Sequence, residues 1–229
     1  MVEVIDAQEK VSEVVAQNEL AIAYHFPSPI YVIEKPEFIF KVKEVAEESL
    51  AKRRKEAKLN DLYPVYMSDN LLDERLSDFL GFAGSTCWNI LDSQGYAMQN
   101  FTTTFTECWV QEHYKHSAMD QHTHNGSVQI VGFYFLDVPK DSSRAVFHDP
   151  RPAKVQLNLP EANMNIATPA SQMINFEPKP GMFIFSNAWL PHSFTRHGNK
   201  KPIRFVHFNV AVQFNQEQTC TITTPPEIV

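Results

Sequence analysis

Residues 120–138, DQHTHNGSVQIVGFYFLDV, decide the fold. The stretch begins with two histidines, His122 and His124, and continues into a nearly uninterrupted apolar run. In an extended strand, residues i and i+2 point to the same face, with about 7 Å between their Cα atoms. Two imidazoles placed in this way can bind one metal ion. A surface pair in a polar loop is the alternative when this spacing stands alone.

A third histidine follows further along the chain. Residues 180–194, PGMFIFSNAWLPHSF, place His192 directly after a second apolar strand. A third imidazole behind a buried strand favours the metal site over the surface loop.

Residues 203–214, IRFVHFNVAVQF, read as a long strand with one charged residue on an apolar face. Arg204 shares its face with Val206, Phe208 and three further apolar residues, so we expect this face to be the interior of a barrel. An unpaired buried charge is costly, and a carboxylate matches the planar guanidinium. The alternation leaves open whether that carboxylate belongs to the protein or to a ligand.

The composition is that of a globular protein. The chain has 229 residues, of which 43% are hydrophobic and 21% charged, and this length predicts one domain. Its net charge of −7 argues against nucleic acid as a partner. Three cysteines without framework spacing indicate free thiols in a reducing compartment. With no signal-peptide pattern and no membrane-length apolar run, we expect a cytoplasmic protein without a membrane partner. A homodimer stays open.

The patterning changes from helix to strand near Gln99. Before it, Phe38, Val42 and Val45 form a helical stripe after Pro36, and residues 26–33 read as an edge strand. Ser68 or Asp69 is expected to cap a second helix, and a third is expected to end near Gly95. After Gln99, apolar segments of strand length recur, and residues 150–179 read as a long loop. The strand segments are residues 101–113, 128–138, 144–149, 181–186 and 203–214.

This order predicts a mainly β fold, an antiparallel double-stranded β-helix of the jelly-roll or cupin-like type. The core is expected over residues 100–215. Residues 1–99 would form an N-terminal arm and supporting helices, and residues 216–229 a C-terminal tail.

Five motifs in this order resemble the Fe(II)- and 2-oxoglutarate-dependent dioxygenases. The resemblance is closest to the oxygenases of bacteria and of phages that infect marine cyanobacteria, and it covers roughly residues 105–214. The motifs are His122-Thr123-His124, residues 131–136, Asp149-Pro150-Arg151, residues 185–192 and residues 204–209.

The resemblance implies Fe(II), with 2-oxoglutarate and O₂ as co-substrates. An unknown small molecule or protein would be oxidised, typically by hydroxylation, with release of succinate and CO₂. His122, His124 and His192 are the implied metal ligands and catalytic residues. The family usually has a carboxylate where this chain has His124. Asp120 shares a strand face with His122 and would restore that carboxylate, so it stays an alternative ligand.

The resemblance also implies a binding site for 2-oxoglutarate. Arg204 would bind the far carboxylate, Tyr114 would donate a hydrogen bond to it, and Asn209 would line the pocket with Trp109. Ordinary packing is the alternative for Tyr114, Trp109 and Asn209, as is a structural turn for the motif at Asp149. The other histidines of this region are expected at the surface or behind the ligands: His113, His116, His148, His197 and His207.

Two other functions are compatible with the same residues. One is a cupin-like metal enzyme with three histidines that uses no 2-oxoglutarate, in which Arg204 has a protein partner. The other is a non-catalytic jelly-roll that serves as a binding or virion-associated protein.

Overall fold

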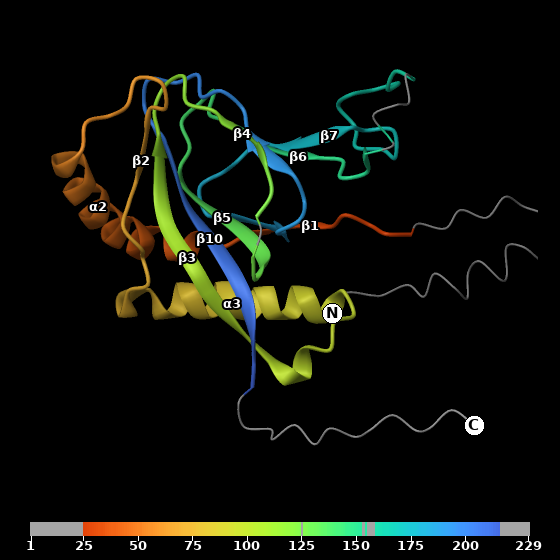
Figure 1. The fold of residues 1–229 in the computed structure, drawn as a ribbon. Helices are drawn as coiled ribbons and strands as arrows, with labels where there is room; N and C mark the ends of the chain where they lie inside the picture. Colours follow the sequence, from red (N-terminus) through yellow and green to blue (C-terminus); the bar gives the residue numbers. More distant parts are fainter. Residues whose placement is uncertain (1–24, 125, 153, 155–158, 216–229) are drawn as a thin grey trace, which may run out of the picture.

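The computed structural model describes residues 25–124, 126–152, 154 and 159–215 (Figure 1). The expected terminal tail and most of the arm lie outside these residues. In chain order the elements are β1 (Ile30–Glu34), the 3₁₀ helix η1 (Pro36–Phe38), α2 (Ile39–Glu56), β2 (Val65–Met67), the 3₁₀ helix η2 (Glu74–Leu76), α3 (Ser77–Ser93), the 3₁₀ helix η3 (Met98–Asn100), β3 (Phe101–His113), β4 (Met119–His122), β5 (Val128–Asp137), β6 (Ala145–His148), β7 (Met173–Phe176), β8 (Met182–Asn187), β9 (His192–Phe194) and β10 (Ile203–Phe214).

The strands form two antiparallel sheets that face each other. The larger has the order β1-β8-β5-β10-β3-β2 and the smaller the order β4-β9-β6-β7. Phe133 and Phe205 from the larger sheet share a buried cluster with Phe147 and Phe194 from the smaller. The expected double-stranded β-helix is confirmed, and β1 lies at the edge of its sheet as predicted.

Helices α2 and α3 pack against the outer face of the larger sheet. Their apolar side chains, such as Val45 and Phe79, join Val206 and Phe208 of β10 in one buried cluster. Strand β10 lies between β5 and β3, so both of its edges are paired. Its even-numbered apolar residues contact the helices, whereas Ile203 and Phe205 belong to the cluster between the sheets.

A close approach of two strands explains the glycine in β5. A Cβ built on Gly132 would lie 2.1 Å from ring atoms of Phe208, which is opposite Gly132 in the β5–β10 register. The aromatic ring therefore occupies the space above this residue.

The helix predictions require two corrections. The second and third predicted helices are one helix, α3, which ends before Gly95 at a φ of +90°. Asp73 caps the preceding helical turn, where its side chain accepts a hydrogen bond from the Arg75 N–H at 2.9 Å. Ser68 does not cap, because its hydroxyl and N–H both bind the backbone of Val110 in β3.

Two further expectations concern cysteines and membranes. Cys87 and Cys108 are buried free thiols, and Cys220 lies outside the described residues. Within the part of the chain that the structure describes, no helix has both the length and the apolarity needed to cross a bilayer.

Candidate metal centre

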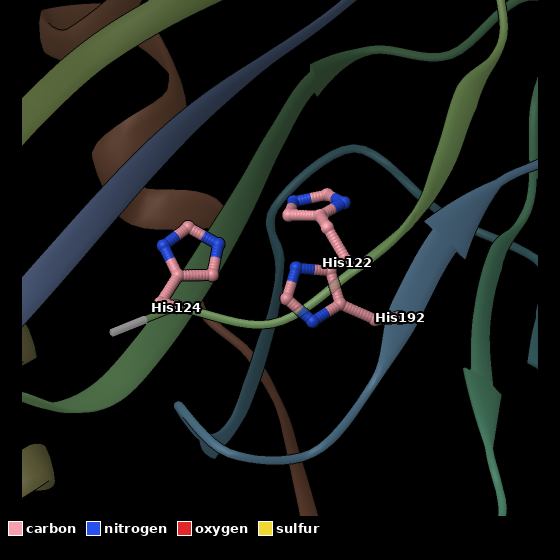
Figure 2. Close-up of side chains that lie close together, drawn as sticks. All are labelled: His122, His124 and His192. Carbon is pink, nitrogen blue, oxygen red and sulfur yellow. The ribbon is translucent and has the colours of Figure 1, made fainter.

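Three histidines from two neighbouring strands converge at one end of the smaller sheet. His122 ends β4 and is paired directly with His192, which begins β9. His124 follows two residues later, where its N–H donates to the Ala188 carbonyl at 2.9 Å. Figure 2 shows the three rings turned toward one another. One nitrogen from each ring lies within 4.8 Å of the others, a spacing that one metal ion could span.

Backbone carbonyls orient two of these rings. His122 Nδ1 donates to the Asp120 carbonyl at 2.8 Å, and His192 Nδ1 donates to the Leu190 carbonyl at 3.0 Å. Each donation leaves the lone pair on Nε2, which is how outer contacts prepare a histidine for a metal. The buried Nε2 atoms of His124 and His192 have no hydrogen-bond partner among the described residues. These nitrogens are therefore suited to a metal ion.

Burial keeps two of the rings neutral. Burial, with smaller contributions from the neighbouring imidazoles, lowers the pKa of His192 to about 3 and that of His124 to about 4. Because only a neutral imidazole can bind a metal, both rings are in the ligating form at neutral pH.

Asp120, the alternative ligand, does not join this group. Its backbone carbonyl holds His122, but its exposed carboxylate is not among the clustered ligand atoms. Within the described residues, the structure brings together the three histidines that were preferred from the sequence.

The expected position of Arg204 is wrong. Its Nη1 lies 3.1 Å from a Glu47 carboxylate oxygen and 3.6 Å from one of Asp137, and its Nη2 lies 3.4 Å from Glu112. Glu47 belongs to α2, so Arg204 points to the helix side of β10 and away from the histidines. The face that it shares with Val206 and Phe208 is covered by helices and is not the barrel interior.

Tyr114 belongs to the same outer network. Its hydroxyl donates to Glu112 at 2.7 Å, and Arg54 Nε donates to the same carboxylate at 3.0 Å. The side chain of Glu112 is only 1% exposed, so these partners compensate a buried negative charge. Neither Tyr114 nor Arg204 lies near the three histidines.

The wall that faces the histidines includes a fourth one. The His207 ring centroid lies 5.2 Å from that of His124 and 4.8 Å from that of Trp109, and the side chain is 3% exposed. His207 Nδ1 and Trp109 Nε1 are buried without a partner among the described residues. From the sequence, His207 was expected at the surface or behind the ligands, although its odd number already places it on the face opposite Arg204.

Asn209 lies on this inner wall as well. Its Nδ2 donates to a Glu107 carboxylate, and its buried Oδ1 has no partner in the described part of the chain. His207, Trp109 and Asn209 are all uncharged at neutral pH, because burial lowers the pKa of His207 well below its usual value. Phe194 and Phe205 are both buried and stack with 4.8 Å between their ring centroids.

The remaining motif is a turn. Arg151 donates through its backbone N–H and its side chain to Asp149, and Lys154 lies 3.1 Å from the same carboxylate. The structural alternative for this motif is confirmed.

Comparisons with known structures agree on the fold. A Pseudomonas putida prolyl-4-hydroxylase has a TM-score of 0.56 at 10% identity, covering 89% of this chain and 98% of that one. A Trichoplax adhaerens prolyl hydroxylase, in complex with a hypoxia inducible factor peptide fragment, has a TM-score of 0.52 at 11% identity over 90% of both chains. A viral collagen prolyl hydroxylase from Paramecium Bursaria Chlorella virus-1, in complex with 2OG, has a TM-score of 0.50 at 8% identity over 80% of this chain and 94% of that one.

None of the curated proteins compared with this sequence matches it. Residues 107–209 match the model of the family described as "Putative 2OG-Fe(II) oxygenase". These residues run from the middle of β3 to Asn209 in β10 and include all three clustered histidines. Through this core the chain is similar to the 2OG-Fe(II) oxygenase family.

Proposed function

We propose that the protein is a non-haem Fe(II)- and 2-oxoglutarate-dependent oxygenase whose iron is held by His122, His124 and His192. The convergence of three imidazole nitrogens in the core that matches the oxygenase family carries this proposal. Imidazole suits iron, and three protein ligands leave coordination positions for a co-substrate. When bound, the iron and the 2-oxo acid activate O₂ and oxidise a C–H bond of the substrate, releasing succinate and CO₂.

The protein residues prepare this site before any ligand binds. The carbonyls of Asp120 and Leu190 orient two of the rings, so little rotational freedom is lost when a metal binds. Phe133 and Phe147 lie against His192, with ring centroids 5.5 and 6.0 Å away, and exclude water from one side of the site. A dry, aromatic surrounding strengthens electrostatic interactions at the metal and protects reactive species from water.

One observation favours a second candidate function. Arg204, the expected partner of 2-oxoglutarate, is engaged by three protein carboxylates. A cupin-like metal enzyme with three histidines and no 2-oxoglutarate would also have this arrangement.

Anaerobic reconstitution with Fe(II) and titration with 2-oxoglutarate test the first function against the second. We expect one iron per chain, saturable binding of 2-oxoglutarate that requires iron, and succinate formation on exposure to O₂. His192→Ala should weaken iron binding by more than the loss of an outer contact does, which typically costs about 10–100-fold in metal affinity. Asp120→Ala, the matched control, should retain iron because only its backbone carbonyl contacts the site.

The outcomes separate the candidates. Iron binding without any response to 2-oxoglutarate supports the cupin-like enzyme. Full iron retention in His192→Ala, or loss in Asp120→Ala, contradicts the ligand assignment.

The proposal extends to the substrate and the compartment. One solved structure with a similar fold is a prolyl hydroxylase in complex with a peptide fragment, so a protein segment or a small molecule with an oxidisable C–H bond is the expected substrate. Two buried free thiols fit a reducing compartment, the cytoplasm of the cell or of the host if a phage encodes the protein.

A further inference from the structure

We propose that Trp109 and His207 bind the far carboxylate of 2-oxoglutarate, so that this chain holds its co-substrate with uncharged donors in place of an arginine. The inference rests on the proposed oxygenase function. It assigns a role to two residues whose buried polar atoms are otherwise unexplained.

The positions of the two side chains carry the proposal. Trp109 of β3 and His207 of β10 are direct partners in the sheet register, and their rings lie 4.8 Å apart. His207 in turn lies 5.2 Å from His124, so the pair forms the wall next to the proposed metal ligands. A ligand that reaches from the metal toward the larger sheet meets these side chains first.

Both side chains hold polar atoms that lack partners within the described residues. An indole N–H is a donor only, and Trp109 Nε1 is buried without an acceptor. His207 Nδ1 is also buried and unpartnered, and it donates in the Nδ1–H tautomer. Leaving such groups unsatisfied costs free energy, whereas a carboxylate offers acceptors to both.

The neighbouring Asn209 offers a hydrogen-bond acceptor and no free donor. Its amide N–H₂ is taken by Glu107, which leaves the carbonyl oxygen Oδ1 toward the inner space. An acceptor would repel a carboxylate, so Asn209 is suited to a donor group of the substrate.

The charges of the site also favour uncharged donors. Fe(II) on three neutral imidazoles keeps its double positive charge, and 2-oxoglutarate brings two negative charges. The charges of the iron and of the co-substrate then cancel. An arginine on the inner wall would add a positive charge that neither of them balances, which is costly in a buried place. The position of Arg204 on the outer face, among three carboxylates, agrees with this balance.

Anaerobic calorimetry on the iron-loaded protein tests the inference with two acids. 2-Oxopentanoate has the length of 2-oxoglutarate but ends in a methyl group, so it reports on metal chelation alone. We expect 2-oxoglutarate to bind the wild type at least about tenfold more tightly than 2-oxopentanoate, the factor for one hydrogen bond to a charged group. Trp109→Phe should lower the affinity for 2-oxoglutarate about tenfold. The affinity of this variant for 2-oxopentanoate should change less than about twofold.

Trp88→Phe is the matched control. Its indole N–H donates to the Phe101 carbonyl at 2.9 Å on the helix side, so this variant should bind both acids as the wild type does. Thermal unfolding and iron content of each variant show whether the fold and the metal site are intact.

His124→Asp tests the charge balance. The added negative charge should lower the affinity for 2-oxoglutarate by at least about tenfold more than the affinity for 2-oxopentanoate. If this variant fails to hold iron, Trp109→Phe decides alone.

Each outcome has a distinct meaning. Equal affinity of both acids for the wild type, or an unchanged preference in Trp109→Phe, overturns the role of the inner wall but leaves the oxygenase function in place. Failure of both acids to bind the iron-loaded wild type contradicts the oxygenase function itself, and the inference with it. Tighter binding of 2-oxoglutarate to His124→Asp overturns the charge argument.

Discussion

At the scale of single residues, Glu112 explains where Arg204 points. Its buried carboxylate accepts hydrogen bonds from Arg54, Tyr114 and Arg204 on the helix side of the larger sheet. Burial, with the nearby Glu112 carboxylate, raises the pKa of Tyr114 to about 12, so the phenol stays a donor at neutral pH. The guanidinium of Arg204 therefore has protein partners and contributes to stability.

Replacing Arg204 should accordingly affect folding and leave co-substrate binding alone. We expect Arg204→Ala to lower the free energy of unfolding by about 1–3 kcal/mol, the range for a lost hydrogen bond to a charged group. Its affinity for 2-oxoglutarate should stay within about twofold of the wild type. Urea unfolding and anaerobic calorimetry measure the two quantities.

Arg54→Ala is the matched comparison, because Arg54 binds Glu112 and Glu47 at shorter distances and should cost more stability. A normally stable Arg204→Ala that has lost more than tenfold of its 2-oxoglutarate affinity would restore the role first expected for Arg204.

The error over Arg204 has a physical cause. Both faces of β10 are apolar, so alternation alone cannot identify which one faces the metal. The separation of Arg204 and Asn209 could have revealed the error. Residues five apart on a strand point to opposite faces, so the two side chains could not both line one pocket. His122, His124 and His192 could be predicted, because the same-face spacing of the first two and the strand before the third are local features.

At the scale of elements, the contact between β5 and β10 depends on the absence of a side chain at Gly132 of β5. We expect Gly132→Ala to destabilise the protein by about 3 kcal/mol, because its Cβ would overlap the buried ring of Phe208. Thermal or urea unfolding measures the loss.

Gly81→Ala in α3 is the control, since nothing lies within 4 Å of its added Cβ and alanine favours a helix by about 0.5–1 kcal/mol. An equally stable Gly132→Ala would mean that the Phe208 ring can move aside without cost.

Element length determines what the sequence could predict. The strands at residues 101–113 and 203–214 have the predicted bounds, because a dozen residues of strand composition are distinctive. Strands β2, β4 and β9 have only three or four residues each, too few for a period to emerge. The predicted break between two helices is absent because residues 77–93 pack continuously on the sheet.

At the scale of the whole molecule, a buried neutral histidine couples stability to pH. His113 is fully buried, donates through Nε2 to Gln111 at 2.7 Å and lies 5.1 Å from the Phe205 ring. Burial, together with the nearby His197, lowers its pKa to about 3. The unfolded chain takes up a proton at this residue below about pH 6.5, whereas the folded chain does so only near pH 3. Acid therefore favours the unfolded state.

We expect the free energy of unfolding of the metal-free protein to fall between pH 7 and pH 5. His113 should contribute about 2 kcal/mol of this loss, at 1.36 kcal/mol for each pH unit below 6.5. Urea unfolding at the two pH values measures it. His113→Phe, which retains an aromatic ring beside Phe205, should lose correspondingly less stability on acidification. The same loss in both proteins would show that His113 is not the residue responsible.

The alternation of β10 gives a simple rule for redesigning this protein. Even-numbered positions from 204 to 210 anchor the helices, and odd-numbered positions from 203 to 209 face the space between the sheets. A variant library that randomises positions 207 and 209 would sample new binding chemistry and leave both the helix anchor and the buried Phe205 untouched. Randomising the even positions would yield mostly unfolded clones. Selection experiments can thus separate chemistry from scaffold along twelve consecutive residues of one strand.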